Sequence, residues 1–230
     1  MIRLVGFFLL VLVALHFLRQ LPVVGRFFDI PILGFWGTAI LISLAASRWA
    51  TFALDRRRTS SRVRALGHVD TPHNQGKLGS LYVGEGRFRA AIAPLERAVA
   101  GESDVAEWRY RLGCALLGLR RPKEAVAALE GAAAIDEEHA YGNLLMRLAE
   151  ARLASGDAAG SLEALERRDR NHGADAESAY RRGLAFRALG KRVEARASFQ
   201  AASKLAAAGG SFRRGEARKW GTLAFLARVF

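Results

Sequence analysis

Four basic residues recur along the chain at intervals of 34, 36 and 34 residues. They are Lys77, Arg111, Arg147 and Arg181, here called the basic row, and the residues just before them are Gly76, Tyr110, Met146 and Tyr180. Arginine forms two parallel hydrogen bonds to a carboxylate, and tyrosine packs against a partner at little entropic cost. If the fold brings these residues onto one surface, that surface suits a protein segment or peptide with acidic groups or a free carboxylate.

Two observations favour a plainer interpretation of the basic row. The sequence is rich in arginine, with 35 Lys and Arg residues in 230, so a recurrence of exposed basic residues can arise by chance. Three glutamates at neighbouring positions, Glu107, Glu150 and Glu177, would also neutralise part of its charge. In this alternative the basic row is a solvated face without a ligand.

The residues that could carry catalysis or bind a metal are scattered. The histidines are His16, His68, His73, His139 and His172, and none lies four residues from another, which is the spacing that two metal ligands on one helix need. Residues 136–138 are acidic but precede a predicted helix, whose N-terminus favours negative charge. Cys114 has no histidine nearby and is predicted to be a packing residue. We therefore predict no enzyme, no cofactor and no metal.

A repeat with the same period predicts the helices that carry the basic row. The pattern opens with a pair of residues in each repeat: Leu78-Gly79, Leu112-Gly113, Leu148-Ala149 and Arg182-Gly183. A small residue follows twelve positions after the second residue of each pair, at Ala91, Ala125, Ser161 and Ala195. A small residue lets two helices approach closely, and large apolar residues fill the remaining gaps. The pattern resembles the tetratricopeptide repeat family, and the resemblance covers residues 72–207. An unrelated all-helical bundle is the alternative.

The resemblance implies an all-α fold, a right-handed solenoid of four helix-turn-helix repeats. The repeats are expected at about 72–105, 106–139, 142–175 and 176–209, with their first helices lining a concave surface that binds protein. Family members that clamp a terminal carboxylate have asparagine at a position where this chain has Ser80, Cys114, Glu150 and Leu184, so that mode is not expected.

The third repeat departs from the pattern in two ways. Ser161 and Arg168 replace small apolar residues, and two extra residues are inserted between positions 136 and 140. We therefore expect the packing of this repeat to differ from that of the other three.

The segment 210–230 is predicted to be a capping helix. Trp220, Leu223 and Ala224 match the opening of a fifth first helix, and a terminal helix covers the end of the last repeat. Its apolar tail also admits contact with a partner or with the membrane surface.

The N-terminal region differs in kind, because residues 1–55 are predicted to form a transmembrane hairpin. The apolar spans are about 2–18 and 31–54, each long enough to cross a bilayer, and a polar turn with Pro22, Gly25 and Asp29 separates them. A cleaved signal peptide is one alternative for the first span, but no small-x-small site follows it. A first span that lies in the interface is the other.

The basic residues after the second span predict the orientation. Arg56, Arg57 and Arg58 begin a basic juxtamembrane linker, 56–71, and positive flanks stay on the cytoplasmic side, where they also attract anionic lipid head groups. The chain is therefore expected to be integral to a cytoplasmic (inner) membrane, with the repeats in the cytoplasm. The excess of arginine and alanine fits a bacterial source.

These features predict a membrane-anchored adaptor or scaffold that binds a protein partner or peptide at the cytoplasmic face. A structural subunit of a larger membrane complex, without an exchangeable ligand, is the alternative. The net charge of +13 admits nucleic acid as a partner, but the chain has no recognition helix and no block of basic residues on the repeats.

Overall fold

The computed structural model describes residues 43–48, 70–208 and 214–229, and the chain divides into two units, Met1–Arg62 and Val63–Phe230. In the first unit residues 43–48 are helical. The predicted spans 2–18 and 31–54 otherwise lie outside the described residues, as do Arg56, Arg57 and Arg58. Within the described part, no helix is both long enough and apolar enough to cross a membrane. The hairpin therefore stays a prediction.

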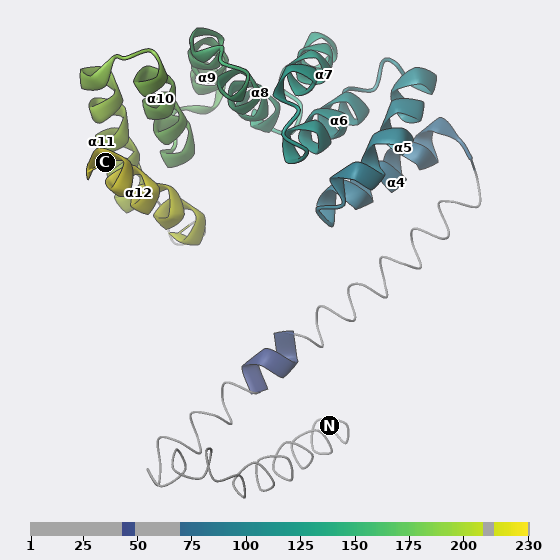
Figure 1. Ribbon diagram of the computed structural model, residues 1–230, viewed down its shortest axis with the longest axis horizontal. Helices are drawn as coiled ribbons and strands as arrows, with labels where there is room; N and C mark the ends of the chain where they lie inside the picture. The colour runs from purple at the N-terminus through teal and green to yellow at the C-terminus, as the bar shows by residue number, and fades with distance from the viewer. Residues whose placement is uncertain (1–42, 49–69, 209–213, 230) are drawn as a thin grey trace, which may run out of the picture. The chain divides into compact units, whose positions relative to one another are not determined.

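The second unit is all-α in its described residues (Figure 1). Its helices are α4 (Pro72–Gly84), α5 (Phe88–Gly101), α6 (Ala106–Gly118), α7 (Pro122–Ile135), α8 (Asn143–Ala154), α9 (Ala158–His172), α10 (Ala176–Ala188), α11 (Arg192–Ala208) and α12 (Arg214–Val229). The first eight form four antiparallel pairs inside the four predicted repeats. Each first helix also contacts the first helix of the next repeat, so the pairs stack side by side.

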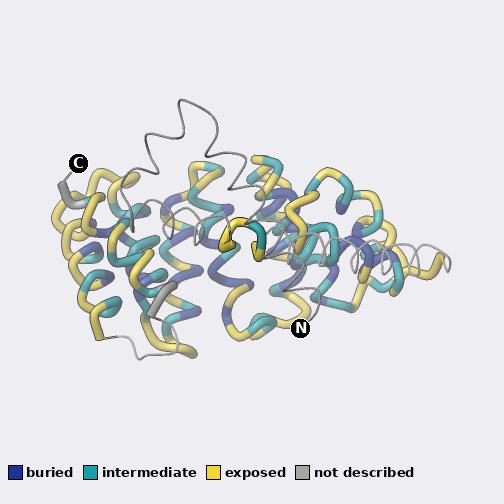
Figure 2. Tube along the Cα trace, turned by 90° about the horizontal axis from the view of Figure 1, so that it is seen from below, coloured by how far each residue is buried: buried dark blue, intermediate teal, exposed yellow. Residues whose placement is uncertain are grey.

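The predicted close approach within each pair is present. A Cβ atom added to Gly79 would lie 2.4 Å from Cγ of Leu95, and one added to Gly113 would lie 2.5 Å from Cγ of Leu129. Gly183 has the same relation to Phe199. These apolar residues are almost completely buried, and Figure 2 shows that buried positions recur along the repeats. The small residue therefore sets the distance between the two helices of a repeat.

The turn inside each repeat has one residue in the left-handed region. Gly86, Gly156 and Gly190 have φ values of 72°, 95° and 75°, and the equivalent residue of the second repeat, Arg120, has a φ of 59°. Glycine adopts this conformation without the steric cost that a side chain brings. The recurring glycine is thus explained by the turn, and Arg120 is a strained exception.

The two extra residues lie in the connection between α7 and α8. Ala140, Tyr141 and Gly142 have φ values of 58°, 54° and 76°, so three successive residues are left-handed. The connection is held from α9, because Arg167 donates two hydrogen bonds to Glu137, at 3.1 and 2.8 Å. The insertion is thereby accommodated without breaking the stack of repeats.

The third repeat buries a charge where the others have alanine. Arg168 stands at the position of Ala98, Ala132 and Ala202, and its side chain is 10% exposed. Its guanidinium donates to Asp169 at 2.9 Å, to the carbonyl of Gly173 at 2.9 Å and to Asp175 at 2.5 Å. The packing differs as expected, and two carboxylates compensate the buried charge: that of Asp169 in α9 itself and that of Asp175, which caps the N-terminus of α10.

The segment after residue 208 forms α12, which packs on α11 and α10. Ala224 is fully buried against α11, with Phe199 and Ala202. Gly221 of α12 also faces the preceding repeat, because a Cβ atom added to it would lie 2.7 Å from Cβ of Ala206.

Candidate partner-binding surface

The first helices α4, α6, α8 and α10 line the inner side of the curved row of repeats in Figure 1, and we call this side the inner surface. Lys77 is exposed there and forms no ion pair with a described residue. The side chains of Arg111 and Arg147 are 37% and 43% exposed, whereas that of Arg181 is only 12% exposed. The four members of the basic row therefore differ in their access to a partner.

Every arginine of the basic row is paired with a glutamate. Arg111 donates to Glu107 at 2.6 Å, and Arg147 donates to Glu150 at 2.7 Å.

Arg181 lies between two carboxylates and joins neighbouring helices. It is 2.7 Å from Glu177 on its own helix, α10, and 3.2 Å from Glu150 on α8. Three arginines and three glutamates thus balance across the inner surface, and Lys77 is the member of the row that adds an uncompensated charge. The basic row is an ordered series of ion pairs and not a uniformly positive stripe.

The two tyrosines that precede arginines of the basic row differ in how far they are exposed. Tyr110 is 8% exposed and packs in the core, whereas Tyr180 is half-buried, and its ring centroid lies 5.5 Å from that of Trp220 in α12. The guanidinium of Arg181 lies 5.4 Å from the same indole ring. Tyr180 and Arg181 therefore face α12, which bounds the inner surface at that end.

The sequence did not reveal the part that His139 takes in this surface. Its Nε2 lies 2.6 Å from Glu107, its ring meets Tyr110 edge to face, and its Nδ1 is 3.6 Å from Asp136. His139 lies in the inserted connection, 32 residues from Glu107 in the chain. The recurrence at a fixed interval could not show this pair, because no other repeat has a histidine at that position.

The charges and packing of the inner surface shift several pKa values. Burial works to raise the pKa of Glu107, but the hydrogen bonds with Arg111 and His139 outweigh it, so that pKa is lowered. Burial raises the pKa of Tyr110 to about 12 and also raises the pKa of the Cys114 thiol. At neutral pH Glu107 is therefore a carboxylate, while Tyr110 and Cys114 are uncharged and Cys114 is a poor nucleophile.

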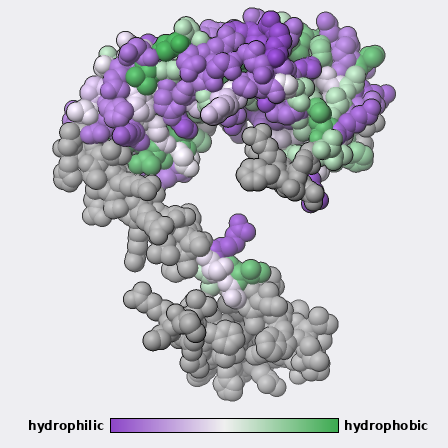
Figure 3. All heavy atoms as spheres, turned by 180° about the vertical axis from the view of Figure 1, so that it is seen from behind, coloured by the Kyte–Doolittle hydropathy of each residue, from purple (hydrophilic) through white to green (hydrophobic). Residues whose placement is uncertain are grey.

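No group of three or more His, Cys, Asp and Glu side chains in the described residues is placed to hold a metal ion. The expectations that the chain binds no cofactor and has no catalytic activity stay predictions. One face of the molecule is largely hydrophilic over the repeats, with hydrophobic residues in separate patches (Figure 3). The ion pairs make the inner surface polar as well.

Comparison with known proteins agrees with the helical architecture. Residues 77–140 match a family model described as tetratricopeptide repeat. No curated protein matches the sequence.

Solved structures of MamA resemble the repeats. The chain is 26% identical to one described as the crystal structure of MamA protein, over 65% of this chain and 86% of that one, with a TM-score of 0.59. It is 19% identical to MamA residues 41 to the end from Desulfovibrio magneticus RS-1, over 68% and 94% of the two chains, with a TM-score of 0.53. A MamA RS-1 ArsTM double mutant gives 16% identity, 72% and 94% coverage and a TM-score of 0.61. The last two show similarity of fold alone.

Proposed function

Because this chain is a tetratricopeptide repeat protein, we propose that it is a membrane-anchored adaptor whose inner surface binds a segment of a protein partner. The observation that carries the proposal is the series of ion pairs on successive first helices. Arg111, Arg147 and Arg181 come from three different repeats, and each is held by a glutamate before a partner arrives. A scaffold that repeats one polar position in this way is suited to an extended segment that runs across several repeats.

The ion pairs reduce the cost of binding. Arginine side chains lose much rotamer freedom when a partner fixes them, about 0.5–1.5 kcal/mol for each side chain ordered at an interface. Here Glu107 and Glu150 already restrict Arg111 and Arg147. Part of the ordering cost is therefore met during folding, which favours binding of a partner with matching charges.

The free donors of the basic row favour a partner with carboxylates. Arg111 uses Nε to reach Glu107, and Arg147 uses Nη1 to reach Glu150. The other guanidinium nitrogens remain to donate, and both side chains are more than a third exposed. Lys77 adds a positive charge at the N-terminal end of the same surface. An acidic side chain or a carboxylate in the partner would bind there.

The membrane part of the proposal is supported by the sequence. Two apolar spans within residues 2–18 and 31–54, followed by Arg56, Arg57 and Arg58, favour an integral anchor with the repeats at the cytoplasmic face. Washing membranes with alkaline carbonate or high salt should leave the chain in the pellet. Release into the supernatant would contradict the integral anchor, and digestion of the repeats by protease outside spheroplasts would contradict the orientation.

The test of the inner surface uses the full chain in mild detergent and the proteins that co-purify with it. The variant Arg111→Gln with Arg147→Gln removes two charges but keeps long polar side chains. We expect at least a tenfold loss of the specific partner, because truncating a buried charge pair at an interface costs about 2–5 kcal/mol. The matched control is Arg89→Gln with Arg196→Gln, which removes two exposed arginines from second helices.

Folding should survive the double substitution, because exposed ion pairs contribute about 0–1 kcal/mol each. An unchanged circular dichroism spectrum would establish this. If the double variant recovers the same partner in the same amount as the control, the inner surface is not the binding site. A partner that stays in fixed stoichiometry through mild extraction would favour the structural subunit over the adaptor.

A further inference from the structure

Each first helix of the repeats has one face that its own second helix covers. The small residues Gly79, Gly113 and Gly183 mark this face, because each approaches a large apolar residue of the second helix that follows. The residues four before and three after the small residue lie on the same face. In the second repeat these are Arg109 and Leu116, and Leu116 is only 5% exposed.

The same face of α12 has no such cover among the described residues. Ala224 of α12 is fully buried against the preceding repeat, as is Ala115 of α6, and the equivalent residue of α10, Ala185, is also fully buried. This match fixes the rotation of α12, and it places Arg218, Thr222 and Phe225 on the face that a second helix would cover. All three are exposed, and Phe225 is 60% exposed.

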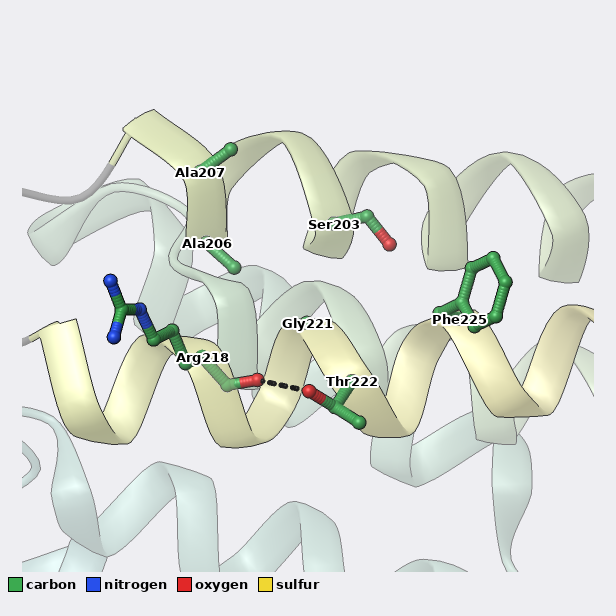
Figure 4. A pocket seen from close by; sticks show the side chains of 7 residues that line it. All are labelled: Ser203, Ala206, Ala207, Arg218, Gly221, Thr222 and Phe225. Carbon is green, nitrogen blue, oxygen red and sulfur yellow. Dashed lines mark hydrogen bonds between the residues drawn. The ribbon is translucent and has the colours of Figure 1, made fainter.

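These residues line an open groove between α11 and α12 (Figure 4). The floor is made of small residues, because a Cβ atom added to Gly221 would lie 2.7 Å from Cβ of Ala206. Arg218 stands at one end and Phe225 at the other, opposite Ser203. The groove has a volume of about 710 Å³. Its floor is shallow and apolar, and a cation stands at one end.

We propose that this groove binds an amphipathic helix of a partner protein, which takes the place of a second helix for α12. The second helices of the chain indicate what such a helix needs. In the first, second and fourth repeats they carry a small residue, then a large apolar residue four positions later, then a small residue three positions after that, as in Ala91, Leu95 and Ala98. The large residue would pack on Thr222 and Phe225, as Leu129 packs on Gly113.

The charge of Arg218 adds a second requirement for the partner helix. Arg218 forms no ion pair with any described residue. In the second repeat, Arg109 is the residue on the corresponding face, and it lies beside Gly131. A Cβ atom added to Gly131 would be 3.2 Å from Nη1 of Arg109. Gly131 directly precedes the second small residue, Ala132. An acidic residue at that place in the partner helix would therefore meet Arg218.

The proposal can be tested with a peptide of residues 122–135, the sequence of α7, that carries Gly131→Glu. The peptide is labelled with a fluorophore, and its anisotropy is measured with the full chain in mild detergent. We expect saturable binding that Phe225→Glu weakens at least tenfold. Tyr141→Glu is the control, because Tyr141 is 89% exposed in the connection between α7 and α8. A peptide with Leu129→Glu should not bind.

The charge requirement has its own test. Arg218→Glu should weaken binding of the peptide with Gly131→Glu at least fivefold and should affect the unmodified peptide less. Appending the same helix to the C-terminus through a flexible linker should raise the Tm of the repeats. Absence of binding by the separate peptide, together with an unchanged Tm of the fusion, overturns the proposal. So does binding that Phe225→Glu leaves unaltered. Self-association of the full chain that Phe225→Glu abolishes would assign the groove to a second copy instead.

Discussion

Replacing Arg168 by alanine should weaken the junction between the third and fourth repeats, although alanine is the residue that the other repeats have at this position. The guanidinium makes three hydrogen bonds of 2.5–2.9 Å, to Asp169, to the carbonyl of Gly173 and to Asp175. Burial works to lower the pKa of Arg168, but hydrogen bonds and ion pairs with the two aspartates outweigh it, and the side chain stays charged. Alanine removes the guanidinium that these two carboxylates share.

The magnitude follows from how far the two carboxylates are buried. Removing one partner of a fully buried ion pair costs about 3–5 kcal/mol. Asp175 is 41% exposed and can be hydrated, and Asp169, which is 10% exposed, keeps its ion pair with Arg182. The cost should therefore lie below that range, at about 2–3 kcal/mol. Loss of the buried alkyl stem of Arg168 adds to the effect.

Hydrogen exchange on the full chain in detergent is the appropriate assay, because repeats unfold in part and an overall melting temperature averages over them. A loss of about 2–3 kcal/mol corresponds to amide exchange in α9 and α10 that is about 30- to 150-fold faster. Exchange in α4 and α5 should not change, since each repeat contacts only its neighbours.

The control for this experiment is Arg196→Ala on α11, which removes an exposed arginine and should change stability by less than about 0.5 kcal/mol. The reasoning would be refuted if amide exchange in α9 and α10 of the Arg168→Ala variant stayed within about threefold of the wild-type rate. That result would mean that the buried ion pairs of Arg168 stabilise the junction no more than an alanine at the same position does.

Three further predictions concern individual positions. Gly113→Val should destabilise the chain by about 1–3 kcal/mol, because the new side chain would overlap Leu129. Gly84→Ala should stabilise it by about 0.5–1 kcal/mol, because a Cβ atom at Gly84 would have nothing within 4 Å. Changes in the free energy of unfolding that have the same sign for both variants in urea denaturation would contradict this. The lowered pKa of Glu107 means that its contribution to stability is present above the ordinary glutamate pKa of about 4.3 and is lost as the pH falls through the folded-state value. The difference in stability between wild type and Glu107→Gln should therefore shrink from about pH 5 to pH 3, and a constant difference would show that Glu107 is not stabilised as a carboxylate. Ultraviolet titration should show one tyrosine with a pKa of about 12, and that step should be absent from Tyr110→Phe; four tyrosines that titrate together near their ordinary value would contradict the burial of Tyr110.

The predicted pairing of helices could be read from the sequence because it depends on local geometry. A glycine or alanine at a fixed interval limits how far apart two sequential helices can lie, and the turn between them is short. Gly79, Gly113 and Gly183 accordingly lie against the second helix of their own repeats. The glutamates expected to offset the basic row lie three or four residues from their arginines, as Glu107 does from Arg111 and Glu150 from Arg147, so helix periodicity alone brought them together.

Contacts between repeats were decided by the tertiary structure. The pair of His139 with Glu107, the ring contact of Trp220 with Tyr180 and the ion pair of Arg182 with Asp169 each join residues of different repeats or of a connection. Their geometry depends on how far each repeat is rotated and shifted against the next, and a recurring interval in the sequence does not contain those quantities. The rotation of α12 shows the same limit. The sequence predicted a helix there, but the face that it buries was set by the only surface available to it within the described part of the chain, that of the preceding repeat.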